Sequence, residues 1–92
     1  MAPDRAEQVA LHALAFVAGS DDLATVFLGS TGVTAGELAR RAADREILLA
    51  VLDFLTMNDA WVRDFCDSAG FDYSDPMTAR SVLAGPAETH WT

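Results

Sequence analysis

Apolar residues follow a helical repeat along nearly the whole chain, and this periodicity restricts the fold more than any other feature. Between Val9 and Leu83 they recur three or four residues apart, which places them on one face of a helix. No segment sustains the alternation of apolar and polar residues that is typical of a half-buried strand. The pattern therefore predicts an all-α fold, a compact bundle of five or six short helices.

Glycines and capping residues divide the pattern into helices. The expected helices cover residues 3–18, 21–29, a stretch that begins after the capping box at 34–37, residues 45–57, residues 59–69, and a stretch from Pro76 to Gly85. Asp44 and Asp75 are the expected N-caps of the fourth and sixth helices, because a short polar side chain can accept hydrogen bonds from the first backbone amides. Residues 29–32 are predicted to form a turn.

The expected buried positions are the apolar ones at helical spacing. They include Val26 and Phe27 in the second helix, Leu38, Ala39 and Ala42 in the third, Ile47, Leu48, Val51, Phe54 and Leu55 in the fourth, and Met77 and Leu83 in the sixth. The fourth helix is the most apolar, so we expect it to lie at the centre of the bundle.

The length of the chain, 92 residues, fits one domain. A chain of this size buries about 60–65% of its unfolded surface and needs neither disulfides nor metals to fold. We expect residues 1–85 to form the domain and residues 86–92 to form a tail. The single cysteine, Cys66, cannot form an internal disulfide, which favours the reducing cytoplasm.

Fourteen acidic residues outnumber the six basic ones, all of them arginine, and give a formal charge of −8. A charge of this sign repels nucleic-acid phosphates and anionic membrane surfaces. No stretch has the roughly eighteen apolar residues that a membrane span needs. The composition therefore argues against nucleic-acid and membrane partners.

The two halves of the chain align when it is shifted by 38 residues. The shift places Leu11, Phe16, Phe27 and Gly32 on Leu49, Phe54, Phe65 and Gly70, and Ser20 on Asn58. Two units are too few for a solenoid, so we expect two helical repeats related by a pseudo-two-fold axis. Chance similarity between alanine-rich helices is the alternative.

No set of side chains indicates catalysis or metal binding. The two histidines are 78 positions apart and there is one cysteine, which does not match the ligand spacing of a zinc site. A P-loop, a dinucleotide fingerprint and a nucleophile elbow are all missing from the sequence. We therefore expect no catalytic, cofactor-binding or metal-binding residues, no cofactor, and a protein that is not an enzyme.

Leu11 and Leu49 are candidate contacts for a partner. They occupy matched positions of the repeat, on helix faces that otherwise carry polar residues or alanine. Leucines exposed in this way indicate a surface for a second subunit or another protein. Packing under the tail or a neighbouring helix is the alternative.

Arg40, Arg41 and Arg45 form a second candidate contact, with half of the arginines inside six positions. Such a cluster can bind a phosphate or a pair of carboxylates, while ion pairing with nearby acidic residues is the simpler explanation. The region between Thr34 and Arg45 also resembles the first helix of a helix-turn-helix DNA binder, which gives a nucleic-acid-linked regulator as the alternative function. The next helix is apolar where a recognition helix would be basic, which argues against this alternative.

Several short motifs resemble a known family in their order and spacing. They are the string from Ala10 to Phe16, Phe27-Leu28 with Gly32, Leu38 with Arg40, residues 51–55, and residues 69–72. Together they are similar to domain-of-unknown-function family 3572, a family of short alphaproteobacterial proteins, over residues 5–85. The resemblance implies a bacterial cytosolic helical protein and assigns no activity, cofactor or functional residue. The expected function is a small acidic interaction module, with an unknown protein partner or a second copy of itself.

Overall fold

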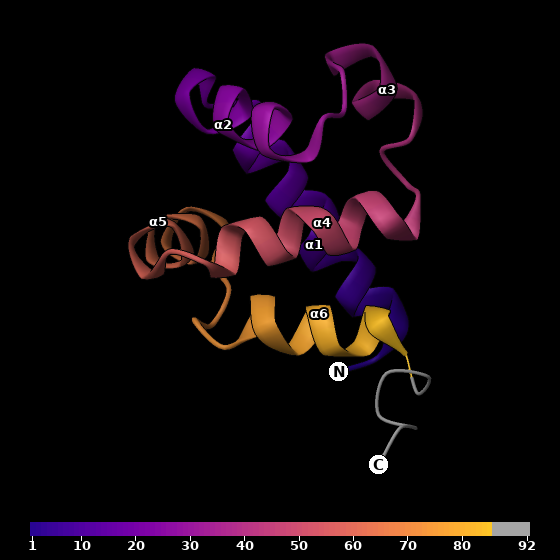
Figure 1. Cartoon of the computed structure of the whole chain (residues 1–92). Helices are drawn as coiled ribbons and strands as arrows, with labels where there is room; N and C mark the ends of the chain where they lie inside the picture. The colour runs from indigo at the N-terminus through magenta and orange to yellow at the C-terminus, as the bar shows by residue number, and fades with distance from the viewer. Residues whose placement is uncertain (86–92) are drawn as a thin grey trace.

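Two apolar helices, α1 (Pro3–Ala18) and α4 (Arg45–Thr56), cross at the centre of the molecule (Figure 1). The computed structural model describes residues 1–85, so the predicted tail lies outside the described residues. Each central helix buries one broad apolar face. The buried residues are Ala6, Val9, Ala10, Ala13, Leu14 and Val17 on α1, and Ile47, Leu48, Val51, Leu52, Phe54 and Leu55 on α4.

Four shorter helices surround this pair: α2 (Asp21–Thr31), α3 (Ala35–Arg40), α5 (Asp59–Ala69) and α6 (Asp75–Ala84). α6 packs along both central helices and buries Pro76, Ala79 and Leu83. α3 lies at the edge of the molecule and has no buried residue (Figure 1). The described chain is therefore all-helical, as the periodicity predicted, with six helices and no strand over residues 1–85.

Phenylalanine pairs join α2 and α5 to the central helices. Phe27 of α2 meets Phe54 of α4 with ring centroids 5.3 Å apart, and Phe65 of α5 meets Phe16 of α1 at 5.5 Å. Both pairs have the edge-to-face geometry that aromatic rings prefer. The shift of 38 residues relates the two pairs to each other, because it places Phe27 on Phe65 and Phe16 on Phe54.

The correspondence between the two halves is limited to their first two helices. α2 and α5 begin and end 38 residues apart, and each is followed by a left-handed glycine, Gly32 with φ of 74° and Gly70 with φ of 77°. The third helices differ, because α6 packs against α1 and α4 whereas α3 packs only loosely against the rest. This difference leaves one side of α1 less covered than the other.

α2 is longer than the sequence predicted. The helix continues through Gly29 to Thr31, so the expected turn at residues 29–32 was wrong. The hydroxyls of Ser30 and Thr31 donate to the carbonyl oxygen of Phe27, at 3.2 and 2.8 Å. Both hydroxyl donors therefore have a hydrogen-bond acceptor within the helix. Gly32 then ends α2 in a left-handed conformation that favours glycine.

Two glycine substitutions test these boundaries of α2. We expect Gly29→Ala to raise the free energy of unfolding by about 0.5–1 kcal/mol, because alanine favours a helix and no atom lies within 4 Å of the added carbon. Gly32→Ala should lower it by about 1–2 kcal/mol, because its φ is 74°. Urea denaturation measures both values. A stability loss in Gly29→Ala would contradict the longer helix.

Two expected N-caps do not cap their helices. The carboxylate of Asp44 accepts a hydrogen bond from Arg41 Nε at 2.8 Å and none from the first amides of α4. Asp75 is itself the first residue of α6, and its carboxylate accepts from the backbone N–H of Asp72 at 3.0 Å. In both places the carboxylate accepts from a donor outside the first turn of its helix. The other expected caps accept from backbone amides, namely Ser20, Thr34 and Asn58.

Four apolar side chains differ from their expected burial, and one of them, Ala39 of α3, is exposed. Val26 is 50% exposed and Met77 is 55% exposed, because α2 and α6 each face the core with a narrower stripe than the spacing suggested. Leu52 is fully buried although the predicted stripe omitted it. α1 and α6 both pack against α4, so a wider arc of α4 is covered than one stripe provides.

Candidate functional site

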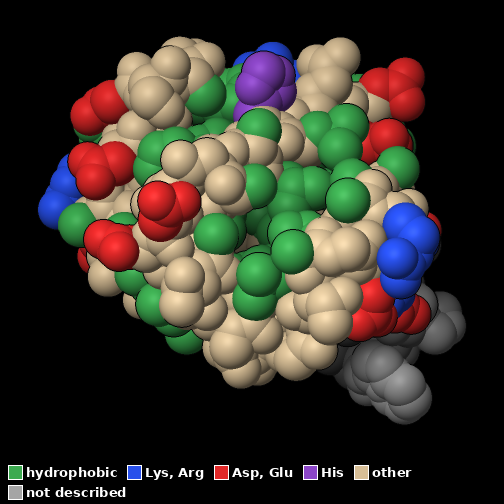
Figure 2. All heavy atoms as spheres, turned by 90° about the horizontal axis from the view of Figure 1, so that it is seen from above, with side chains coloured by type: hydrophobic (Ala, Val, Ile, Leu, Met, Phe, Trp, Pro, Cys, Tyr) green, Lys and Arg blue, Asp and Glu red, His purple; other side chains and the backbone are tan. Residues whose placement is uncertain are grey.

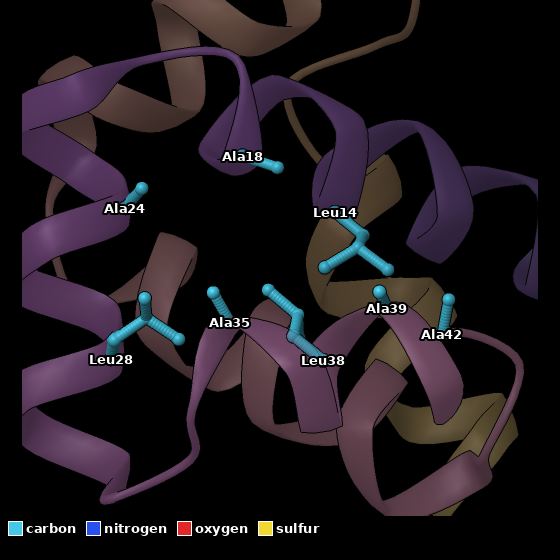
Figure 3. Close-up of a pocket in the computed structure, with 8 residues that line it drawn as sticks. All are labelled: Leu14, Ala18, Ala24, Leu28, Ala35, Leu38, Ala39 and Ala42. Atoms are coloured by element: carbon cyan, nitrogen blue, oxygen red, sulfur yellow. The ribbon is translucent and has the colours of Figure 1, made fainter.

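An apolar groove lies between α1, α2 and α3, on the face seen from above in Figure 2. Apolar side chains gather there around a hollow with a volume of about 360 Å³. Every lining residue is alanine or leucine, and these residues point toward one another from the three helices (Figure 3). They are Leu14 and Ala18 of α1, Ala24 and Leu28 of α2, and Ala35, Leu38, Ala39 and Ala42 in and just after α3.

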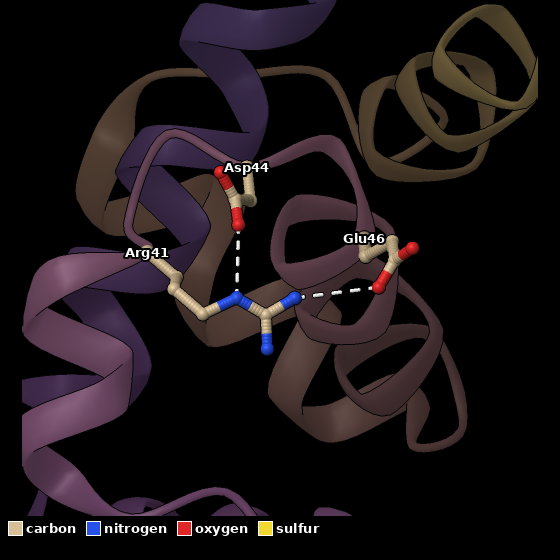
Figure 4. A network of polar contacts seen from close by, with 3 residues as sticks. All are labelled: Arg41, Asp44 and Glu46. Carbon is tan, nitrogen blue, oxygen red and sulfur yellow. Dashed lines mark hydrogen bonds and ion pairs between the residues drawn. The ribbon is translucent and has the colours of Figure 1, made fainter.

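Polar contacts hold both ends of α3 at the rim of this groove. Thr34 and Glu37 form a capping box at its start, in which Thr34 Oγ1 accepts from the Glu37 N–H at 3.1 Å. After its end, Arg41 contacts Asp44 at 2.8 Å and Glu46 at 3.3 Å (Figure 4). These local contacts stabilise the two ends of α3, which has no buried residue. Its short alanine side chains leave the space between α3 and α1 open.

The hollow is a groove that is open at the molecular surface. The volume, about 360 Å³, falls within the range of small binding pockets. Because the lining carries no charged side chain, the groove suits an apolar group whose burial removes hydrocarbon surface from water.

The structure does not make Leu11 and Leu49 an equivalent pair. Leu11 is 37% exposed on α1. Leu49 is half-buried and packs against the core, because α4 is covered over a wider arc than α1. Of the two predicted contact residues, Leu11 is therefore the accessible one, and it lies one helical turn before Leu14 of the groove.

The three clustered arginines are placed against different parts of the chain. Arg41 pairs with Asp44 and Glu46, and the hydrogen bond that its Nε donates to the carboxylate of Asp44 raises the pKa of Arg41 above its usual value. Arg45 reaches toward Gly85 at the end of α6, and Arg40 folds back along α3 toward Gly36. Of the two explanations for the arginine cluster, ion pairing with local acidic residues therefore holds for Arg41.

The helix after α3 is the buried helix α4. Six of its residues, including Leu48 and Leu52, belong to the core. The exposed residues of α4 include two carboxylates, Glu46 and Asp53, and one arginine, Arg45. This is not the basic face with which a recognition helix enters the major groove of DNA.

Cys66 is a small core residue, as its position in the sequence predicted. It is 1% exposed, and its Sγ donates to the carbonyl oxygen of Asp72 at 3.3 Å. Burial raises the pKa of the Cys66 thiol above its usual value, and the negative charge of nearby aspartates, Asp75 foremost, adds to this. Both effects disfavour the thiolate, which is the reactive form.

Two predictions follow from the burial and the raised pKa of Cys66. We expect a thiol reagent to label the folded protein at least about tenfold more slowly than the urea-unfolded chain at neutral pH. Because the pKa is raised in the folded state, the contribution of the neutral thiol to stability is complete below the unfolded pKa of about 8.5 and declines as the pH rises above it. Equal labelling rates would contradict the burial of Cys66.

Within residues 1–85, no three His, Cys, Asp or Glu side chains are grouped as ligands for a metal ion. No single described helix has the length and apolar character of a membrane span. Only α1 and α2 taken together meet these two criteria, and the chain bends by 108° between them.

Comparison with known proteins identifies the family. Searches of curated proteins and of solved structures found no match. The family described as "Protein of unknown function (DUF3572)" matches residues 3–86, nearly the whole chain, and this confirms the resemblance inferred from the sequence motifs. The chain therefore belongs to the DUF3572 family.

Proposed function

We propose that this protein is a non-enzymatic interaction module of the bacterial cytoplasm, which binds an apolar segment of a partner protein in the groove between α1, α2 and α3. The observation that carries the proposal is the lining, which consists of alanine and leucine alone around an open hollow. Burial of one leucine-sized side chain there contributes about 1.5–3 kcal/mol to binding.

The lining favours binding over catalysis. General acid–base and nucleophilic catalysis both need ionisable or hydroxyl groups within hydrogen-bond reach of a substrate. No residue that lines the groove has such a side chain. Small side chains such as Ala35 and Ala39 instead allow a partner's backbone to approach α3 closely.

A pair of alanine variants tests this proposal. Ala39 and Ala43 are both exposed, and Ala39 lines the groove whereas Ala43 does not. We expect the native protein and Ala43→Glu to retain the same partner from a source-cell lysate at moderate salt. Ala39→Glu should lose that partner, because a partner would have to bury the new carboxylate without a compensating charge.

The controls separate loss of binding from loss of folding. Circular dichroism should show the same helix content in both variants, since each change is at an exposed position. Sedimentation of the native protein alone shows whether the partner is a second copy of the chain. Equal retention by Ala39→Glu and Ala43→Glu would overturn the groove as the binding site.

A further inference from the structure

We infer that the segment bound in the groove is an amphipathic helix that carries a lysine or arginine about two helical turns away from its aliphatic anchor. The inference rests on the proposed function, because it concerns the partner of the same groove. Its basis is a stripe along one side of α1 that is acidic and exposed at one end and apolar at the other.

The stripe runs along one side of α1. Asp4, Glu7, Leu11, Leu14 and Ala18 follow one another at steps of three or four residues, which makes them neighbours on the helix surface. Asp4, Glu7 and Leu11 help to line a second hollow of about 260 Å³. Leu14 and Ala18 line the apolar groove. Leu11 of the second hollow and Leu14 of the apolar groove are three residues apart, which makes them neighbours on the surface of α1.

The acidic end of the stripe has no counter-charge in the described chain. Over residues 1–85 the ion pairs join Arg5, Arg41 and Arg80 to other carboxylates, and none involves Asp4 or Glu7. The nearest cation along α1, Arg5, is turned away. Its guanidinium lies 3.9 Å from Asp75 and 4.8 Å from the ring centre of Phe71. Two exposed carboxylates on the same side of α1, two to three helical turns before the groove, therefore complement a basic group on a partner that lies along α1.

The spacing along α1 gives the pattern expected in the partner. Glu7 and Leu14 are seven residues apart, which is about 10 Å along a helix at 1.5 Å per residue. A partner helix along α1 would reach both points with residues about seven positions apart. α1 already packs against a helix on its other side, where Ala79 of α6 is fully buried in the core.

Selection from a random peptide library against the folded protein tests the inference, with peptides of about four helical turns. We expect the enriched peptides to pair aliphatic residues with a lysine or arginine about seven positions away. Their affinity should fall about three- to tenfold on the double variant Asp4→Asn with Glu7→Gln.

A matched control removes the same charge from another helix. Asp59→Asn with Asp64→Asn also takes away one first-turn aspartate and one further exposed carboxylate, on α5. This control should change the affinity by less than about twofold, because charges farther from the bound peptide are screened by salt.

The outcomes separate the inference from the proposed function. Enriched peptides without a basic residue, or an equal loss on both double variants, would overturn the inference and leave the groove as the binding site. Peptides that bind Ala39→Glu as well as the native protein would overturn the proposed function. Failure to enrich any peptide would overturn both.

Discussion

Replacing Phe65 with alanine should lower the free energy of unfolding by about 3–5 kcal/mol. Phe65 is 1% exposed, and its ring centroid lies 5.5 Å from that of Phe16 and 5.6 Å from that of Phe71. The variant loses this packing and leaves a cavity between α5 and α1. A domain of this size has a total stability of about 5–15 kcal/mol, so Phe65→Ala should remove between about a fifth and all of it.

Urea denaturation followed by circular dichroism measures this loss. Val26→Ala provides the comparison, since Val26 is 50% exposed on α2, and it should change stability by no more than about 0.5 kcal/mol. A cost below about 1 kcal/mol for Phe65→Ala would mean that α5 does not pack against α1 through this ring.

The same alanine-to-leucine change should have opposite consequences at two positions. Ala10 is fully buried on the face of α1 that packs against α4 and α6, and Ala10→Leu should destabilise the fold by about 1–3 kcal/mol through overpacking. Ala24 lines the groove, so Ala24→Leu should leave stability unchanged or raise it by up to about 1 kcal/mol.

Thermal and urea denaturation of these two variants test whether the groove is open space. Ala24→Leu should also weaken retention of the partner, because the new side chain occupies the groove. If Ala24→Leu destabilised the protein as much as Ala10→Leu, the space between α2 and α3 would be closed.

Features that depend on local sequence were predictable. The bounds of α1, the caps Ser20 and Asn58, and the left-handed Gly70 all follow from interactions within a few residues. The turn predicted at residues 29–32 failed for an equally local reason. α2 continues through Gly29 to Thr31, and the hydroxyls of Ser30 and Thr31 donate back to the carbonyl oxygen of Phe27 within this helix.

The groove depends on distances between helices, and periodicity does not contain them. The sequence predicted Leu38, Ala39 and Ala42 as an inner face, and these residues do point inward (Figure 3). What they face is open space, because α3 packs only loosely against the other helices and its alanine side chains are short. Packing between helices also separates Leu49 from Leu11, to which it is matched in sequence. Leu49 is half-buried because α1 and α6 both pack against α4, whereas Leu11 is exposed.

Photo-crosslinking in the source cell tests the central claim most directly. A photoreactive amino acid placed at Ala39 lies in the groove, and one placed at Ala60 lies at an exposed position of α5 that does not line it. We expect Ala39 to yield a covalent adduct with one partner protein or a second copy of the chain, and Ala60 to yield none with that partner. An adduct with the same partner at Ala60, with none at Ala39, would contradict the groove as the binding site.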